Sequence, residues 1–553
     1  MVRFIVLKCQ STEAALSTKT VRKLKAWLTL HRWGLLAAGL ALGLSVWFVL
    51  AMRMHPLFDP LLPGYDMTVF HQWAIRISEG ALSDGRAFYQ APLYPYLLGA
   101  LYALTGPSIL AAKLLQAVVG SLTVLTTYLL GCRLFGRRAG LIAAILTAIT
   151  PIFPFYEIFL LRATLVTLLN IAFLLALHSF DPDKPLRTSV LAGALLGLGA
   201  IARANLLVLW PVAAAWVWLG IKNRRQKAIS VAVLTLAAVA VISPVTLHNR
   251  LVDGQWALIS TNFSENWKIG NSYDSTGGFV YPEKELVPVL SVDFVKLQAR
   301  KALKLAADYE QPNNVNFYQL QPENPWLAAG NLLSWGFFIC FGLMGIVLTC
   351  GRWRQLFPLY CYLLFYGGTL VLFFVTSRFR VPLWPVLILF SASGLDRVAE
   401  LWGQRKRIEP LLALALAAVI AGWMIVANPR SVEPRYRDNL AVLYEQNRNW
   451  TAAEHEMRLK LDGLPDDPAT VWKLAYYLQK QDRLKESSVL VERLLILVDN
   501  RPDVLREAGL LDLGLGQTAR GVERLRSYLS ASPDASDSAR IADLIEQYHR
   551  VEN

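Results

Sequence analysis

Long apolar segments recur along this chain and determine its class. A helix of about 20 apolar residues crosses the hydrocarbon core of a bilayer. About eleven segments reach or approach this length, with short polar loops between them. The sequence therefore predicts an all-α, polytopic membrane protein, because helices are the elements that satisfy the backbone inside lipid. The predicted spans are residues 33–52, 108–132, 139–155, 162–180, 188–203, 205–221, 227–247, 327–350, 355–376, 379–395 and 409–427.

One further apolar segment, residues 91–106, is short and rich in Pro and Tyr. If it crossed the membrane, the basic loop 133–138 would face outward. If it lies along the outer surface as a juxtamembrane helix, the basic short loops all face the cytoplasm, as the positive-inside rule requires. We expect the second arrangement. The basic residues concerned are Arg133, Arg137, Arg138, Lys184, Arg187, Lys222, Arg224, Arg225, Lys227, Arg352, Arg354, Arg397, Arg405, Lys406 and Arg407.

The spans divide the chain into five parts. Residues 1–32 form a basic cytoplasmic N-terminus, which precedes an apolar run of full spanning length and is typical of a retained signal anchor. Residues 33–247 form a transmembrane module with an outward first loop at 53–107. Residues 248–325 form a periplasmic loop domain, residues 326–427 the last transmembrane helices, and residues 428–553 a periplasmic domain.

The C-terminal region repeats with a period of 34 residues. Leu440, Leu474 and Ala508 are separated by this interval, and Ala453, Ser487 and Gly521 keep the same interval. This is the period of a tetratricopeptide repeat, in which small residues lie where two helices touch. We expect an α-solenoid that either binds a protein partner on its curved surface or only braces the membrane part.

Composition agrees with a membrane protein and excludes other classes. Hydrophobic residues make up 54% of the 553 residues, charged residues only 17%, and the mean hydropathy is +0.37. The formal net charge of +14 lies mainly in short loops, so it indicates membrane orientation, and no nucleic-acid partner is expected. The five cysteines lie in predicted spans or on the predicted inner side, which predicts neither disulfides nor a Cys/His metal site.

Two outward carboxylates are candidate catalytic groups. Asp66 lies in the first loop, just after Tyr65, and Glu157 lies in a short second loop; aromatic and apolar residues flank both. We expect desolvation to raise the pKa of such a carboxyl group toward the working range of a general base.

Several basic residues lie at the predicted outer boundary, against the positive-inside rule. Each alone is typical of a side chain that extends to the headgroup level. Together they predict a cationic rim for a lipid-borne phosphate, which arginine binds in a bidentate manner. The residues are Lys113, Arg162, Arg203, Arg378 and Arg380, of which the last two share one tight loop.

In the order of these residues the chain resembles the GT-C superfamily, most closely the bacterial protein O-mannosyltransferase and aminoarabinose transferase group. The resemblance covers roughly residues 33–427. It rests on the first-loop Asp66 and on Ala-Pro-Leu-Tyr-Pro-Tyr-Leu-Leu at 91–98, Arg-Leu-Phe-Gly-Arg-Arg-Ala-Gly-Leu at 133–141, Ala-Arg-Ala-Asn-Leu at 202–206, Ser-Arg-Phe-Arg-Val-Pro at 377–382 and the stretches 244–250 and 259–271.

The resemblance implies an inverting membrane glycosyltransferase that takes a sugar from a polyprenyl-phosphate donor in the bacterial inner membrane and acts at the periplasmic face. Asp66 would be the general base or acceptor-activating carboxylate, and Glu157 the second-loop acid. Two departures affect the donor site: Asp66 stands without a second acid beside it, and Gln90 and Ala91 replace a Lys before Pro. Some members of the superfamily use a divalent metal; without a second acid beside Asp66 we expect no cofactor and favour no metal.

The acceptor is expected to be a glycan, a lipid or a protein, handled by the loop domain and the repeats. Tyr65, Asn262, Trp267 and Asn271 are weaker candidates for contacts with the acceptor or the sugar. Two alternatives stay open at this stage. One is an O-antigen ligase or polymerase that uses a diphosphate-linked glycan, and the other is a non-catalytic scaffold or transporter with a repeat domain.

Overall fold

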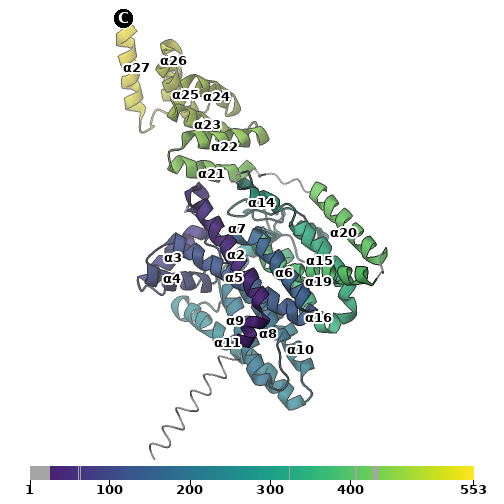
Figure 1. Cartoon of the computed structure of the whole chain (residues 1–553). Helices are drawn as coiled ribbons and strands as arrows, with labels where there is room; N and C mark the ends of the chain where they lie inside the picture. Colours follow the sequence, from purple (N-terminus) through teal and green to yellow (C-terminus); the bar gives the residue numbers. More distant parts are fainter. Residues whose placement is uncertain are drawn as a thin grey trace, which may run out of the picture. The chain divides into compact units, whose positions relative to one another are not determined.

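The computed structural model describes residues 25–59, 62, 64–322, 324–404, 408–427, 432 and 434–552 (Figure 1). Within these ranges the chain forms helices and no β-strand; two residues, Ser272 and Leu286, form an isolated bridge. The predicted all-α class of a polytopic membrane protein is confirmed.

The chain forms two compact units. The first comprises Met1–Arg53 and Leu61–Arg430, and the second comprises Met54–Pro60 and Ser431–Asn553. The first unit is called here the membrane unit and the second the repeat unit, and each is described by itself.

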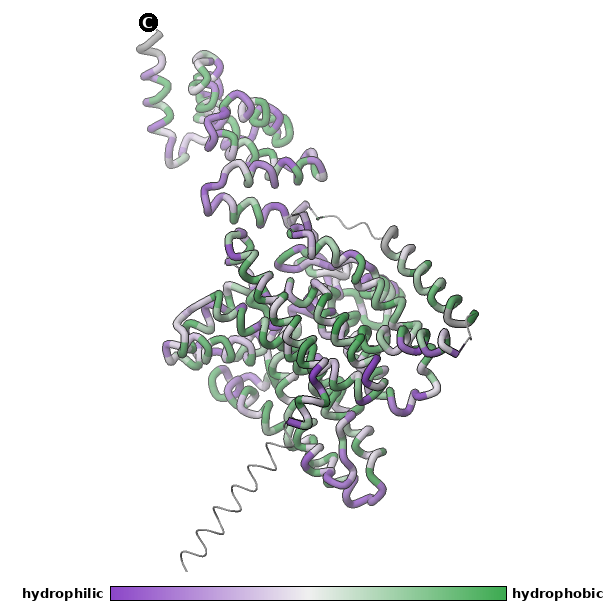
Figure 2. Tube along the Cα trace, viewed as in Figure 1, coloured by the Kyte–Doolittle hydropathy of each residue, from purple (hydrophilic) through white to green (hydrophobic). Residues whose placement is uncertain are grey.

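Apolar helices make up most of the membrane unit, and six helical stretches are long and apolar enough to cross a bilayer. The protein is therefore an integral membrane protein, while the exact number of spans stays a prediction. Figure 2 shows hydrophobic residues along these helices. The helices are α2 (Arg32–Ala51), α5 (Ile109–Phe135), α6 (Arg137–Ile149), α8 (Ala163–His178), α9 (Pro185–Ala202), α10 (Trp210–Gly220), α11 (Arg224–Asp253), α15 (Trp335–Thr349), α16 (Trp353–Cys361), α17 (Gly367–Leu372), α19 (Trp384–Gly403) and α20 (Ile408–Ala427).

Glycines allow these helices to pack closely. A Cβ atom on Gly131 of α5 would lie 2.8 Å from the Cα of Gly140 in α6. A side chain on Gly193 of α9 would collide with the Leu234 carbonyl oxygen of α11. Inside a bilayer, helices associate by such close packing, because lipid tails are as apolar as leucine side chains.

Shorter helices connect the long ones: α3 (Asp66–Ser78), α4 (Leu93–Thr105), α7 (Ile152–Glu157), α12 (Phe263–Asn271), α13 (Val292–Ala306), α14 (Pro325–Ala329) and α18 (Ser377–Arg380). The apolar segment 91–106 forms α4, which packs against α3 and ends at Gly106 with φ +73°. A left-handed φ of this kind is adopted readily by glycine, which explains where the helix ends.

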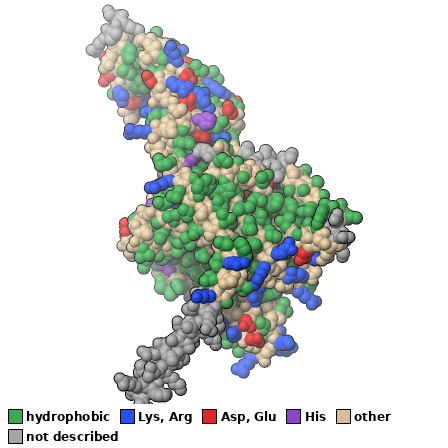
Figure 3. All heavy atoms as spheres, viewed as in Figure 1, with side chains coloured by type: hydrophobic (Ala, Val, Ile, Leu, Met, Phe, Trp, Pro, Cys, Tyr) green, Lys and Arg blue, Asp and Glu red, His purple; other side chains and the backbone are tan. Residues whose placement is uncertain are grey.

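The basic loops that were predicted to share one side of the membrane contact one another. Arg133 donates a hydrogen bond to the His178 carbonyl, and Arg352 donates one to the Leu134 carbonyl. The guanidinium of Arg138 lies 3.4 Å from the carboxylate of Asp396. Figure 3 shows a broad hydrophobic face, with Lys and Arg side chains gathered near α10 and α16. Arg405, Lys406 and Arg407 lie outside the described residues.

The repeat unit contains three helix pairs with a constant spacing. Their first helices begin at 434, 468 and 502 and their second helices at 450, 484 and 518, which is 34 residues apart in every case. Ser487 donates a hydrogen bond to the Ala475 carbonyl, and a Cβ on Gly521 would lie 2.9 Å from the Gly509 carbonyl oxygen, so small residues do lie between paired helices. Assignment to the tetratricopeptide class stays a prediction. The helices are α21 (Pro434–Gln446), α22 (Trp450–Gly463), α23 (Pro468–Lys480), α24 (Leu484–Leu497), α25 (Pro502–Gly514), α26 (Thr518–Ala531) and α27 (Ser538–Glu552).

Candidate active site

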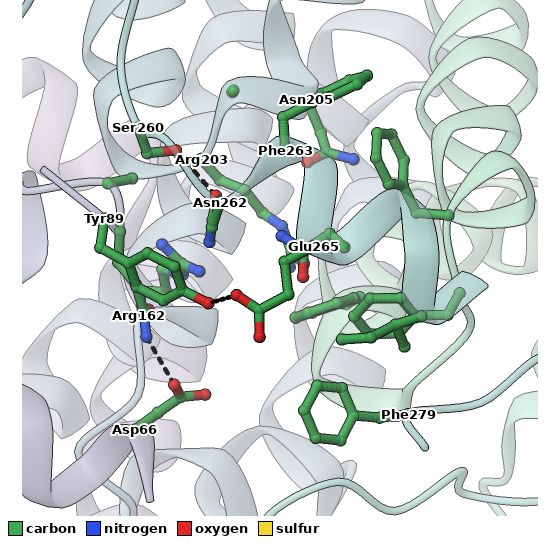
Figure 4. Close-up of a pocket in the computed structure, with 18 of the residues that line it drawn as sticks. Asp66, Tyr89, Arg162, Arg203, Asn205, Ser260, Asn262, Phe263, Glu265 and Phe279 are labelled. Carbon is green, nitrogen blue, oxygen red and sulfur yellow. Dashed lines mark hydrogen bonds between the residues drawn. The ribbon is translucent and has the colours of Figure 1, made fainter. Parts of the chain in front are cut away.

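A cavity of about 490 Å³ in the membrane unit is lined by five charged residues: Asp66, Arg162, Arg203, Glu265 and Arg378. Its walls come from the start of α3, the segment before α4, the breaks before α8 and after α9, α12, and the segment 369–379. Irregular backbone in a membrane protein is tolerated where it lines such a cavity. The polar lining residues used below are Asp66, Tyr89, Gln90, Arg162, Arg203, Asn205, Asn262, Glu265 and Arg378 (Figure 4).

Asp66 is the first residue of α3. Gly64, with φ +81°, turns the chain, and the extended Tyr65 caps the helix, so that Asp66 projects from its first turn. One carboxylate oxygen accepts a 2.8 Å hydrogen bond from Gln90, and the other is paired with Arg378. The structure therefore brings Asp66 and Arg378 into contact, although 312 residues separate them.

The prediction that the pKa of Asp66 is raised is wrong. Burial alone would raise the pKa of this carboxyl group, but the charge and hydrogen bond of Arg378 lower it to about 2. The opposite charge at contact distance outweighs desolvation. Asp66 is therefore a carboxylate at any physiological pH, and while Arg378 is paired with it, it is a weak base.

Three arginines enter the cavity from interruptions in the helices. Arg162 immediately precedes α8, Arg203 follows α9, and Arg378 lies in the single turn of α18. The Phe379 ring fixes two of them, because its centroid lies 3.4 Å from the Arg203 guanidinium carbon and 4.8 Å from that of Arg378. Guanidinium groups bind the faces of aromatic rings favourably. Their N–H donors are thereby held at one end of the cavity.

A second carboxylate enters from α12. Glu265 accepts a hydrogen bond from the Tyr89 hydroxyl, and Figure 4 shows Glu265 and Asp66 turned toward the same open space. Asn205 and Thr369 are joined by a 2.7 Å hydrogen bond on the cavity wall. Phenylalanine side chains complete the wall: Phe263, Phe279, Phe373, Phe374 and Phe379.

A family model described as dolichyl-phosphate-mannose-protein mannosyltransferase matches residues 89–248. This match supports the predicted resemblance to the GT-C superfamily. No curated protein matches this chain.

Solved structures give weaker likenesses to this chain. The apo oligosaccharyltransferase of Archaeoglobus fulgidus is 15% identical, with a TM-score of 0.37, and the alignment covers 73% of this chain and 57% of that one. ArnT from Cupriavidus metallidurans bound to undecaprenyl phosphate is 15% identical, with a TM-score of 0.44, and the alignment covers 90% and 80% of the two chains. This chain therefore spans somewhat more than half the length of the oligosaccharyltransferase.

Of the five basic residues predicted to bind phosphate, the structure brings Arg162, Arg203 and Arg378 into the cavity and leaves two outside. Arg380 is fully buried and lies 2.8 Å from Glu310; it also donates to the carbonyls of Ala307 and Tyr309. Its guanidinium is thus occupied in holding the loop before α14. Lys113 is buried in α5 and does not line the cavity.

Glu157 also lies away from the cavity. Its side chain is buried against Gly120 of α5, where any Cβ atom would collide with it, and it is hydrogen-bonded to Ser45. Gln116 binds the backbone carbonyl of Glu157 at 2.8 Å and that of Phe159 at 2.8 Å, which fixes the turn after α7.

The Glu157→Gln variant is expected to retain transfer activity to within about twofold, because its carboxylate does not touch the cavity. Its thermal unfolding temperature is expected to stay about the same, because burial raises the pKa of Glu157 to about 8, so that a neutral amide replaces a neutral carboxyl group at pH 7. Activity and melting of the purified protein in detergent check this. Loss of transfer with normal melting would instead give Glu157 the catalytic role that its sequence position suggested.

The residues predicted more weakly to contact the acceptor or the sugar also differ in whether they line the cavity. Asn262 lines the cavity and accepts a 3.1 Å hydrogen bond from Ser260. Tyr65 and Trp267 do not line it; Trp267 stacks against Phe294. Asn271 lies at the end of α12 and bonds the Leu372 carbonyl at 2.9 Å, so it fastens the cavity wall and has no free face toward a ligand.

Sequence reasoning missed Tyr89, Asn205 and Glu265 as cavity residues. Tyr89 lies just before the stretch 91–98, Asn205 lies inside the stretch 202–206 and Glu265 lies inside the stretch 259–271, so all three lay within or beside segments that carried the resemblance. Nothing in the local pattern separates Glu265 from the solvated acids of the same loop, such as Glu283 and Glu285. Only the fold, which brings α12 opposite the segment before α4, makes the distinction.

Proposed function

We propose that the protein is an inverting glycosyltransferase that transfers a sugar from a polyprenyl-phosphate donor to an acceptor at the outer face of the bacterial plasma membrane. The observation that carries this proposal is one cavity in which three arginines and two carboxylates meet, formed by the ends of membrane helices. A lipid-linked donor can enter such a site from the bilayer, whereas its reacting sugar needs polar groups. The family match supports the same chemistry.

The donor phosphate would bind to Arg378, Arg203 and Arg162. Arginine matches phosphate oxygens with paired N–H donors, and the Phe379 ring holds the guanidinium groups of Arg203 and Arg378 in place before the donor arrives. As the bond between the sugar and the phosphate breaks, negative charge grows on the phosphate oxygens. The arginines then bind the transition state more strongly than the ground state, which is the source of the rate enhancement. The wall of phenylalanine side chains offers an apolar surface to the start of the prenyl chain.

Asp66 would stabilise the positive charge that develops at the anomeric carbon, since glycosyl transfer passes through an oxocarbenium-like transition state. Its ion pair with Arg378 places it beside the site of the phosphate. The two cavity carboxylates are held by Gln90, Arg378 and Tyr89, and no group of three His, Cys, Asp or Glu side chains suited to a metal occurs among the described residues. These residues fit an arginine-based phosphate site better than a divalent cation, and we propose that no cofactor is needed.

The remaining assignments belong to the same proposal. The basic loops that gather at one end of the membrane unit would face the cytoplasm, which leaves the cavity on the periplasmic side of the inner membrane. The acceptor would be a glycan, a lipid or a protein, and the repeat unit would bind a protein partner or the acceptor itself.

The experiment that tests this function compares cells with and without the protein. Lipids are extracted and analysed by mass spectrometry, together with the surface glycans. We expect a polyprenyl monophosphate sugar to accumulate and one glycosylated product to disappear when the protein is absent. Accumulation of a diphosphate-linked glycan would indicate a ligase or polymerase instead, and unchanged lipids and glycans would indicate a scaffold or transporter.

A further inference from the structure

Helix α13 (Val292–Ala306) presents two kinds of surface. One side packs against the protein, and its residues Phe294, Leu297 and Lys301 are buried. Residues three and four positions apart lie on the same side of a helix. The opposite side is exposed, and it divides into an apolar part and a basic part.

The exposed apolar part is a stripe of aliphatic side chains. Val292 is 69% exposed, Val295 is 65% exposed and Leu303 is 74% exposed. With about 3.6 residues per helical turn, these positions and three exposed alanines near them lie along one side of the helix. The alanines are Ala299, Ala302 and Ala306. An exposed apolar patch of this kind marks a site of contact with a membrane or with a protein.

Basic residues border the apolar stripe. Lys296 and Arg300 are exposed and lie one turn apart, and Lys304 follows one turn later. The carboxylate of Asp293 lies 3.9 Å from the Lys296 ammonium group, so the border carries three basic residues and one acid. An apolar stripe beside a basic border is typical of a helix that lies in the surface of a membrane.

The buried side of α13 is fastened to the end of an apolar helical stretch. The ammonium group of Lys301 donates hydrogen bonds to the carbonyls of Leu372 and Phe373 at 3.2 and 3.0 Å. Leu372 is the last residue of Trp335–Leu372, which is long and apolar enough to cross a bilayer. Because a membrane-spanning stretch ends where the hydrocarbon of the bilayer ends, α13 lies at the level of the lipid headgroups.

We propose that α13 lies on the bilayer surface, with its apolar stripe against lipid chains and with Lys296 and Arg300 bound to the phosphates of anionic lipids. The membrane is the partner that the structure favours, because Leu364 and Leu372 of the neighbouring apolar stretch are also exposed, so the lipid-facing surface continues onto α13. The basic border matches the negative charge of such lipids. This inference goes beyond the proposed transfer reaction and does not depend on it.

The contact with lipid would anchor one wall of the cavity. Lys301 also donates a 3.1 Å hydrogen bond to the carbonyl of Gly270 at the end of α12. A Cβ atom on Gly270 would collide with the carbonyl of Phe373, so the two segments are in direct contact. Both α12 and Phe373 contribute to the lining of the cavity. The wall that they form is therefore held at the membrane surface through α13.

The first test is photochemical crosslinking of the full-length protein in its own membrane. Val295 is replaced by the photoreactive amino acid p-benzoylphenylalanine, and the irradiated protein is analysed by mass spectrometry. We expect phospholipid adducts, as at the exposed Leu236 of the membrane helix α11, and none at the exposed Glu283 of the same loop region. A crosslink to a second copy of the chain or to another protein would overturn the inference. So would the absence of adducts at Val295 while Leu236 gives them.

The second test addresses the anionic headgroups. The protein with the photoreactive residue at position 295 is placed in nanodiscs that mix phosphatidylglycerol with phosphatidylcholine, and the ratio of the two lipids among its adducts is measured. Lys296→Gln and Arg300→Gln should each lower the share of phosphatidylglycerol about fivefold relative to phosphatidylcholine. The matched control is Lys284→Gln, an exposed lysine of the same loop region, which should leave the ratio unchanged. An unchanged ratio in the double variant would overturn the assignment of these two residues to lipid phosphates.

Discussion

Replacing Arg378 by alanine should lower kcat/KM for the donor by about 10²–10³-fold, equivalent to about 3–4 kcal/mol of lost transition-state stabilisation. Arg378 is the arginine that touches both Asp66 and the Phe379 ring, so it links the phosphate site to the catalytic carboxylate. Its removal takes away N–H donors aimed at the leaving phosphate. It also leaves Asp66 partly buried without a counter-ion, which raises the pKa of Asp66. Donor turnover at several donor concentrations measures the effect.

Two further variants, Arg378→Lys and Arg380→Lys, show whether the loss of activity in Arg378→Ala comes from the missing phosphate contacts or from a less stable protein. Arg378→Lys keeps the charge but loses the planar pair of donors, so its activity should lie between wild type and Arg378→Ala. Arg380→Lys provides the contrast: Arg380 is buried with Glu310 and backbone carbonyls, so this change should lower the melting temperature with little effect on donor KM. If Arg378→Ala retained normal kcat/KM in a well-folded protein, the arginines would not be the phosphate site.

The sequence predicted the helices, and which loops lie on the same side of the membrane, better than it predicted where individual side chains point. The period of 34 residues and the long apolar runs follow from local chemistry, and both recur as helices in the structure. The meeting of Asp66 with Arg378 could be predicted because outward loops of a membrane protein share one side. Which of two arginines in one loop enters the cavity could not. Arg378 and Arg380 are two residues apart in a single helical turn, so they point in different directions.

Tertiary contacts also reversed one electrostatic expectation. Aromatic neighbours in the sequence suggested that desolvation would dominate the pKa of Asp66, but a guanidinium from 312 residues away decides it. Glu157 has similar neighbours in sequence, yet it packs against Gly120 inside the helices and not in the cavity. The residues that flank a position in the sequence indicate how apolar a loop is. Which residue pairs with a charged side chain depends on the whole fold.

The Asp66→Asn variant should lose about 10²–10³-fold in kcat while its KM for the donor falls or stays the same. Asparagine preserves the shape of the side chain and can still bond Gln90, but it cannot stabilise positive charge at the anomeric carbon. The change also alters the balance of charge among the cavity residues. The three arginines and two acidic residues that line the cavity have a formal net charge of +1 in the wild type, which becomes +2 in the variant. The extra positive charge favours the donor phosphate in the ground state.

The pH dependence distinguishes this role from that of a base. The pKa of Asp66 in the folded protein, about 2, lies below its ordinary value of 3.8, so the stability gained from its ion pair is present above pH 3.8 and is lost as the pH falls toward 2. Between pH 5 and 8, Asp66 therefore does not titrate in the free enzyme. The acid limb of kcat/KM should lie at the same pH in wild type and in Asp66→Asn, measured in nanodiscs with a fixed donor. If the acid limb of the wild type disappeared in Asp66→Asn, Asp66 itself would be the proton acceptor, because only a group that titrates in the working range can produce it.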